Sequence, residues 1–310
     1  MNNKARYVSI QEHKALPIFA KSWWLDAVVG KEAWDVAIAE DKQGNIEGIW
    51  AYCFKKQFGF KRIFMPPFTP YLGPVMLQSV FENEYQQRSA EHRIMASLLA
   101  QIPECRDIRQ KFQPELNNWL PFRWEGFKQT TTYTYLIRDT HNPAAIFDGL
   151  KDTLQRQIRK AEKKVNVFES DNFRNPLKLM QRSVSQQGAS LNISEAYAEK
   201  IDKACQQHQS RLILEAKDET GNLHAALYLV FDQQSMHYLY GGYEQTFADS
   251  GAMSLLFWKA IQVASEKGLS FNFEGSMLQG VERYFRSFGG NLVPVHFVYQ
   301  SKFPFNLISI

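Results

Sequence analysis

The pattern of apolar and polar positions is most regular in the second half of the chain. Apolar runs bounded by polar or glycine-containing turns predict strands, which we place at residues 212–216, 223–231, 236–242, 269–274 and 292–300. Apolar residues at helical spacing predict a helix at 252–267, closed by Gly268, and a shorter helix at 279–288. This order of elements predicts a mixed sheet flanked by helices, an α/β fold.

The first half repeats part of this pattern. Four residues recur at a constant offset of 177 positions, where Ala39, Asp41, Gly44 and Asn45 match Ala216, Asp218, Gly221 and Asn222. Each segment is typical of a hairpin with a Gly-Asn turn, and each follows a predicted helix, at 14–29 and at 195–209, the second opened by Ser194 as its N-cap. The match is either a coincidence of common turn residues or a duplication, and the shared helix–hairpin order favours duplication. We therefore expect two related α/β units, residues 1–137 and 138–310.

Composition excludes several classes of protein. The net charge of +4 permits an anionic partner but lacks the concentrated charge of a dedicated nucleic-acid binder. Three widely spaced cysteines form no CxxC pair and predict no disulfide framework. The start lacks the apolar core of a signal peptide, and no run is long enough to span a bilayer. We expect a cytoplasmic protein without a transmembrane segment, which can still contact a membrane surface.

Several catalytic motifs are missing from the sequence. It contains no GxGxxG after a strand, no GxxxxGK[ST] and no GxSxG. The seven histidines show no metal-ligand spacing, so we expect no metal site. Cys205 and His208 lie three residues apart on one helix, a spacing that fits a buried cysteine beside a surface histidine better than a thiol–base pair.

A basic helix is the clearest electrostatic feature. One apolar stripe runs along it, formed by Leu150, Leu154, Ile158, Ala161 and Val165. A separate positive face contains Arg156, Arg159, Lys160 and Lys163. That face is either an ordinary solvated surface or a binding site for tRNA phosphate, anionic lipid or a phosphorylated acceptor.

The second half resembles the GNAT acyltransferase family. The resemblance rests on the order of a hairpin, a strand ending in Tyr240-Gly241-Gly242, a helix, a strand ending in Asn-Phe-Glu-Gly-Ser (272–276), and the segment Gly-Val-Glu-Arg-Tyr-Phe-Arg-Ser-Phe-Gly-Gly (280–290). It is similar to the branch that contains the Fem peptidoglycan aminoacyltransferases and their acetyltransferase-like relatives. The resemblance implies two tandem GNAT-like units, each with a mixed, mostly antiparallel sheet flanked by helices.

The resemblance also implies where the acyl donor binds. Its carbonyl would lie where the strands at 236–242 and 269–274 splay apart, beside Tyr240, Gly241 and Gly242, because exposed amides there can hold an oxyanion. Its phosphates would lie at the next helix N-terminus, near Ser250, Gly251, Ala252 and Met253. The segment 247–252 departs from the usual coenzyme A loop, and Asp249 would repel a pyrophosphate. The donor is therefore acyl-CoA or aminoacyl-tRNA, with no covalently bound cofactor.

Four polar residues are candidates for chemistry. Glu274 ends a predicted strand, where it takes a proton from an attacking amine, holds the amine as a cation before attack, or caps the following turn. Tyr284, where related folds place a tyrosine, either protonates the leaving group or packs beside its aromatic neighbours. Arg283 and Arg286 can hold an anionic substrate group or merely solvate a helix face.

The sequence thus predicts direct transfer of an acyl or aminoacyl group to an amine of a small molecule or cell-envelope precursor, because no covalent nucleophile is evident. The alternative is a non-catalytic GNAT-like module that binds an anionic partner through the basic helix 154–164. In the first half, the proline–aromatic segment 64–74 either lines an acceptor cleft or seals the edge of a core.

Overall fold

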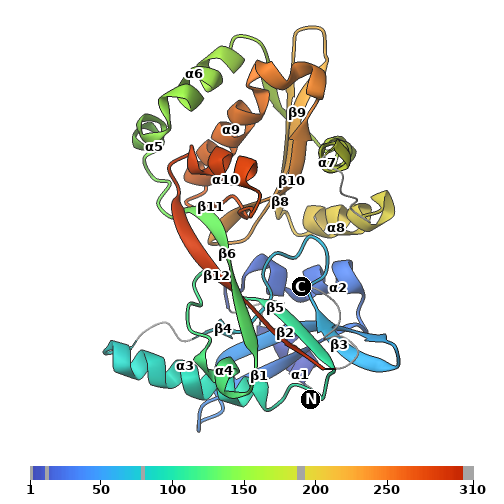
Figure 1. Ribbon diagram of the computed structural model, residues 1–310, viewed down its shortest axis with the longest axis vertical. Coiled ribbons are helices and arrows are strands. Elements are labelled where there is room, and N and C mark those ends of the chain that lie inside the picture. The colour runs from blue at the N-terminus through green and yellow to red at the C-terminus, as the bar shows by residue number, and fades with distance from the viewer. Residues whose placement is uncertain (1–2, 11–13, 78–80, 187–192, 303–310) are drawn as a thin grey trace. The chain divides into compact units, whose positions relative to one another are not determined.

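The computed structural model describes residues 3–10, 14–77, 81–186 and 193–302 (Figure 1). Contacts divide the chain into two compact units, one made of residues 1–132 and 294–310 and the other of residues 133–293. The division expected after residue 137 differs from this one in two ways. The observed division falls inside the strand at residues 128–137, whereas the expected one falls at its end. The last strand of the chain also groups with the first unit for most of its length.

The first unit is a mixed sheet with flanking helices. Its elements are α1 (Asn3–Ile10), η1 (Ile18–Ala20), α2 (Ser22–Val29), β1 (Trp34–Glu40), β2 (Ile46–Gln57), β3 (Phe60–Phe64), β4 (Val75–Met76), α3 (Glu84–Leu99), β5 (Asp107–Lys111), α4 (Leu120–Trp124) and most of β12 (Asn291–Ser301). The strand order is β1-β2-β3-β5-β12, with β4 on β2. The helix expected at 14–29 is shorter than predicted, since α2 begins at Ser22 after a separate 3₁₀ turn that follows Pro17.

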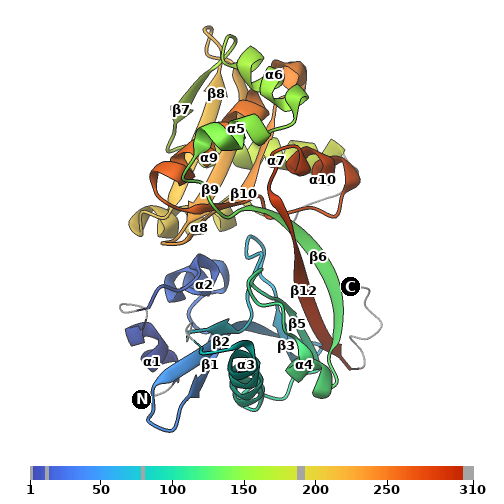
Figure 2. The same ribbon diagram turned by 90° about the vertical axis from the view of Figure 1, so that its left-hand side faces the viewer.

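The second unit has the same plan with more helices. Its elements are the end of β6 (Lys128–Ile137), α5 (Pro143–Gly149), α6 (Asp152–Ala161), β7 (Asn166–Glu169), α7 (Arg174–Gln186), α8 (Glu195–Gln207), β8 (Arg211–Lys217), β9 (Leu223–Phe231), β10 (Ser235–Tyr243), η2 (Gln245–Ser250), α9 (Ala252–Glu266), β11 (Ser270–Asn272) and α10 (Gln279–Arg286). The strand order is β6-β11-β10-β9-β8-β7. Figures 1 and 2 show α5, α6, α9 and α10 on one face of this sheet and α7 and α8 on the other.

The two hairpins match down to their hydrogen bonds. In the β1–β2 turn, Asp41 Oδ1 accepts from the amides of residues 43 and 45, and in the β8–β9 turn Asp218 Oδ1 accepts from those of residues 220 and 222. Gly44 and Gly221 adopt φ of 85° and 86°, the left-handed region that favours glycine. The repeated residues therefore build the same turn twice, in agreement with duplication.

The equivalence extends along both units. In each, the hairpin leads to a third strand, a crossover helix and a parallel fourth strand: β3, α3 and β5 in the first, β10, α9 and β11 in the second. The strand that ends each repeat is exchanged, since β6 pairs with β11 of the second unit and β12 pairs with β5 of the first. This exchange explains why a linear boundary at residue 137 does not describe the contacts.

Candidate active site

Two parallel strands of the second unit diverge near its centre. The β10–β11 ladder pairs Ser235 with Ser270, Met236 with Phe271 and His237 with Asn272, and ends there. Beyond this point β10 continues along β9 through an irregularity between Tyr238 and Tyr240, while the amide of Phe273 donates to a carbonyl of β6. The expected strand 269–274 is therefore shorter, and the fork that was predicted is present.

A cavity of about 580 Å³ opens beside this fork. Its walls come from the second half of β10, from η2, from the first turn of α9 and from α10, with α6 and α7 at the rim. Seven of the residues expected at the donor site line it: Gly241, Gly242, Ser250, Gly251, Ala252, Met253 and Tyr284. The volume lies in the range of small-molecule sites.

Gly251 is required by the close approach of α6. Its φ of 77° is left-handed, and a Cβ there would lie 2.8 Å from the carbonyl oxygen of Gln157. The turn it forms delivers the start of α9 to the cavity, and Ser250 Oγ accepts a hydrogen bond from the Ala252 amide at 3.2 Å. A helix N-terminus attracts negative charge, so this wall suits an oxyanion or a phosphate.

Tyr284 lies in the cavity on the α9 side of the sheet. Its Oη is 3.1 Å from Ser254 Oγ, and its ring packs against Phe257 and Phe288. Burial raises the pKa of Tyr284, so the phenol stays protonated well above neutral pH. A protonated phenol beside the proposed donor position can give a proton to a leaving group.

Glu274 lies at the fork and is held by a buried polar network. His237 Nδ1 is 2.6 Å from Glu274 Oε1, and the Glu274 amide donates to Asn272 Oδ1 at 2.8 Å. Thr134 Oγ1 donates to the same Asn272 oxygen at 2.6 Å. Glu274 is a non-glycine residue with φ of 59°, a strained conformation that often marks functional positions. Its side chain is 12% exposed, so it is not directed at bulk water.

Glu274 and Tyr284 approach the fork from opposite faces of the sheet. Met236 and Tyr238 belong to the core beneath α9, and successive side chains of a strand alternate between faces. His237, and Glu274 with it, therefore lie on the face that α7 and α8 cover, whereas Tyr284 contacts α9. The cavity is lined by Tyr284 and not by Glu274.

The other expected site residues lie outside the cavity. Tyr240 is buried and stacks on Tyr228 with ring centroids 4.6 Å apart. Arg283 and Arg286 are exposed on α10, and Arg286 pairs with Glu282. The basic face of α6 is exposed as expected, and its neighbour Gln157 lines the cavity. Three of its residues, Arg156, Arg159 and Lys160, lie on α6 itself.

The corresponding place in the first unit is filled by its own chain. The β3–β5 ladder pairs Arg62 with Asp107 and Ile63 with Ile108. Beyond it, the Leu72 amide donates to the Lys111 carbonyl, and Tyr71 and Leu72 are fully buried. The proline–aromatic segment therefore packs into the core of its unit beside β5.

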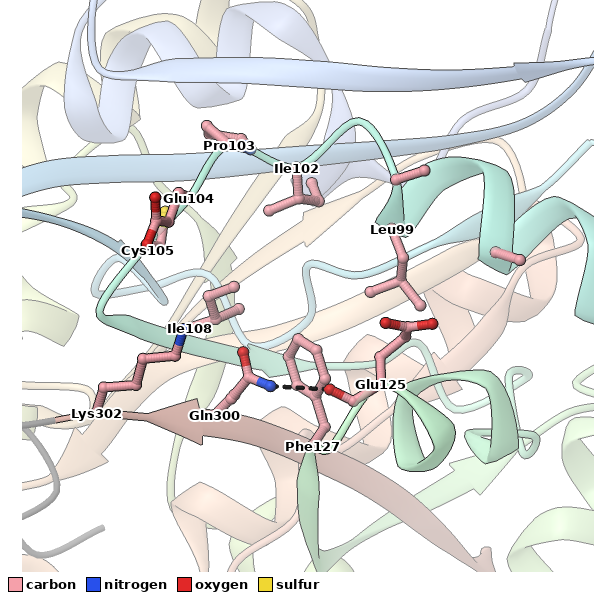
Figure 3. Close-up of a pocket in the computed structure, with 12 residues that line it drawn as sticks. Leu99, Ile102, Pro103, Glu104, Cys105, Ile108, Glu125, Phe127, Gln300 and Lys302 are labelled. Atoms are coloured by element: carbon pink, nitrogen blue, oxygen red, sulfur yellow. Dashed lines mark hydrogen bonds between the residues drawn. The ribbon is translucent and has the colours of Figure 1, made fainter.

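A second cavity, of about 350 Å³, lies in the first unit between the end of α3, β5 and the end of β12 (Figure 3). Gln300 crosses it to donate to the carbonyl of Glu125. Burial raises the pKa of Cys105 in its wall, which keeps that thiol protonated and unreactive. This cavity lacks the strand fork and helix N-terminus of the first one.

The described part of the chain, residues 3–10, 14–77, 81–186 and 193–302, lacks two further features. No cluster of three metal-ligating side chains occurs there. In the same ranges, no helix combines the length and apolar character needed to cross a bilayer.

The comparisons with known proteins agree with this architecture. Residues 150–286 match the family model of the acetyltransferase (GNAT) domain. This span contains every residue that lines the cavity beside the fork. The fold is similar to that of FemX, with a TM-score of 0.70 at 14% identity over 99% of both chains. L-PGS from Bacillus licheniformis has a TM-score of 0.54 at 12% identity, over 99% of this chain and 95% of the other.

A conserved protein of unknown function from Bacteroides thetaiotaomicron has a TM-score of 0.54 at 9% identity over 97% of both chains. No curated protein matches by sequence. The chain thus has a fold similar to that of FemX, residues 150–286 match the GNAT domain model, and the expected fold class is confirmed.

Proposed function

We propose that the chain is an N-acyltransferase whose reaction takes place at the fork of the second unit. The observation that carries this proposal is the end of the β10–β11 ladder after His237 and Asn272, beside a cavity bounded by the first turn of α9. A forked sheet leaves main-chain groups of β10 without a strand partner on one edge, where an amide can polarise a carbonyl. FemX and L-PGS share the fold, and the GNAT match supports acyl transfer as the reaction class.

The donor carbonyl lies at the fork in this proposal, and the donor chain fills the cavity. An amine from the opposite face attacks the carbonyl carbon, forming the C–N bond. Glu274 takes the proton that the amine nitrogen loses, and the bond from carbon to the donor sulfur or oxygen breaks. Tyr284 protonates that leaving group, and both residues then exchange protons with solvent. The opposite placement of the two side chains keeps the base on the acceptor side and the acid on the donor side.

The basic face of α6 is proposed to hold the phosphates of the donor. Gln157 lines the cavity, so its exposed neighbours Arg156, Arg159 and Lys160 lie beside it on the same helix. Both donor classes, acyl-CoA and aminoacyl-tRNA, carry phosphates that guanidinium and ammonium groups bind. The acceptor is an amine of a small molecule or of a cell-envelope precursor.

A direct test is amide formation from radiolabelled acetyl-CoA or alanyl-tRNA, each mixed with amino sugars, amino acids and a peptidoglycan pentapeptide precursor. We expect one donor to yield a labelled amide, and Glu274→Gln to slow it by about 10²- to 10⁴-fold. We also expect that donor to stabilise the fold by about 2.7 kcal/mol at 100 times its Kd. If neither donor stabilises the chain or forms product, the transferase proposal is wrong.

A second candidate is a non-catalytic module that binds an anionic partner through α6. The exposed position of its basic face, together with the exposed Asp249 in the loop before α9, favours it. This candidate predicts salt-dependent binding of tRNA or anionic vesicles without turnover. Its binding would be lost on charge reversal in α6 and unchanged by Glu274→Gln.

A further inference from the structure

The carboxyl group of Glu274 has one oxygen engaged and one available. Oε1 is 2.6 Å from His237 Nδ1, a short distance for a hydrogen bond between these atom types. Oε2 is buried and has no hydrogen-bond partner among the described residues. Buried polar atoms of folded proteins nearly always have a hydrogen-bond partner, so we expect the bound substrate to supply one for Oε2.

Local contacts hold the backbone around Glu274. The left-handed conformation at Glu274 is followed by another at Gly275, where φ is 63° and an added Cβ would overlap the carbonyl oxygen of Tyr133. The Glu274 amide donates to Asn272, which also accepts from Thr134 and is almost fully buried. With the backbone held in this way, the Glu274 side chain reaches His237.

His237 lies on β10 directly across the ladder from Asn272, the last pair before the strands diverge. Its side chain is 7% exposed, so its position is fixed by packing. An ionised carboxylate only accepts hydrogen bonds, so Nδ1 must carry a proton when Glu274 is charged. A hydrogen bond from Nδ1–H fixes the orientation of the carboxyl group, and its charged form is the one that can act as a base.

We propose that His237 is a positioning residue for the base: it donates Nδ1–H to Glu274 Oε1 and leaves Oε2 as the atom that takes the amine proton. This inference rests on the proposed function. The imidazole keeps its own proton throughout, and the transferred proton ends on Oε2. The role of His237 is to hold the carboxyl group in the orientation that presents Oε2 to the amine.

The hydrogen bond can be tested without any substrate. In ¹⁵N-labelled chain, long-range proton–nitrogen NMR distinguishes a protonated from an unprotonated Nδ1, and the signal of His237 is assigned by its loss in His237→Asn. We expect a protonated Nδ1 in the wild-type chain near neutral pH. An unprotonated Nδ1, which accepts from a neutral Glu274, overturns the proposal.

Kinetics then separates positioning from proton transfer, with the donor and acceptor that give product in the assay above. His237→Leu removes the donor and should lower kcat about 10- to 100-fold with little change in the donor KM. His237→Asn places an amide N–H near the position of Nδ1 and should recover kcat to within about 3-fold. If His237→Asn is as slow as His237→Leu, the imidazole itself carries the proton and positioning is refuted.

A matched control is His141→Leu. His141 Nδ1 is 2.9 Å from Asp139 Oδ1, a similar pair in the same unit, but both side chains are about 80% exposed. We expect unchanged kcat and thermal stability in this variant. A wild-type chain that forms no amide refutes the proposed function, whereas the NMR signal of Nδ1 still decides the hydrogen bond.

Discussion

Removal of the Tyr284 hydroxyl should reduce activity far more than it reduces stability. In Tyr284→Phe the ring keeps its packing against Phe257 and Phe288, and the variant loses the 3.1 Å hydrogen bond to Ser254. One such bond contributes about 1 kcal/mol to the free energy of unfolding. For a domain of this size, that loss lowers the Tm by about 2–4 °C.

The kinetic effect has a different magnitude because it arises in the transition state. Loss of a general acid slows a reaction by about 10²- to 10⁴-fold, and at 1.36 kcal/mol per tenfold this raises the barrier by about 2.7–5.5 kcal/mol. Burial raises the pKa of Tyr284, so the wild-type chain should keep its acid up to at least the ordinary tyrosine value near pH 10. The variant should lack this contribution at every pH below that value.

The assay compares initial rates of amide formation and thermal unfolding for the wild-type chain, Tyr284→Phe and Tyr85→Phe. Tyr85 is 81% exposed on α3 of the first unit and serves as a tyrosine control. A decrease in rate of less than about 3-fold in Tyr284→Phe, with the expected small change in Tm, would refute its role as the acid. A large loss of Tm would instead show that the hydroxyl holds the cavity wall together.

Three further outcomes are expected. Gly251→Ala should destabilise the chain by about 1–3 kcal/mol in denaturant unfolding. Gly268→Ala should destabilise the chain less. Both glycines have positive φ, but an added Cβ at Gly251 meets the carbonyl oxygen of Gln157, whereas one at Gly268 meets no atom within 4 Å. Reversal of the three basic residues on the exposed face of α6 to Glu should raise the donor KM about tenfold at low salt. High salt should reduce the effect, and Lys200→Glu on α8 should show none. All three cysteines are buried, and burial raises the pKa of Cys205 to about 12. A chromogenic disulfide reagent should therefore react with no thiol in the native chain and with three thiols after unfolding. Rapid native reaction would contradict this and would reopen a thiol mechanism.

Local pattern was enough to predict much of the fold. The hairpin turns follow from Asp, Gly and Asn at fixed spacing, because the side-chain and backbone hydrogen bonds involved span only four residues. Ser194 caps α8 as expected by accepting from the Tyr197 amide. The apolar stripe of α6 is buried along its whole length, since helical spacing alone determines which side chains share a face. The family resemblance then placed the loop before α9 and Tyr284 at one site.

Other features depended on contacts between distant segments. The exchange of β6 and β12 between the repeats determines the boundaries of the units, and no local signal encodes which sheet a terminal strand will join. His237 was overlooked although it is a polar residue within a buried strand, a signal that could have marked it. Its contact with Glu274, 37 positions along the chain, could be seen only in the tertiary structure.

Strand pairing also determines which residues line the cavity. Tyr240 was expected beside the donor, but the irregularity after Tyr238 and the stacking on Tyr228 place it on the other face. Sequence spacing specifies turns, caps and helix faces, because these depend on neighbours a few residues apart. The pairing of strands specifies the fork and places Glu274 and Tyr284 on opposite faces, because both features depend on where ladders end in three dimensions.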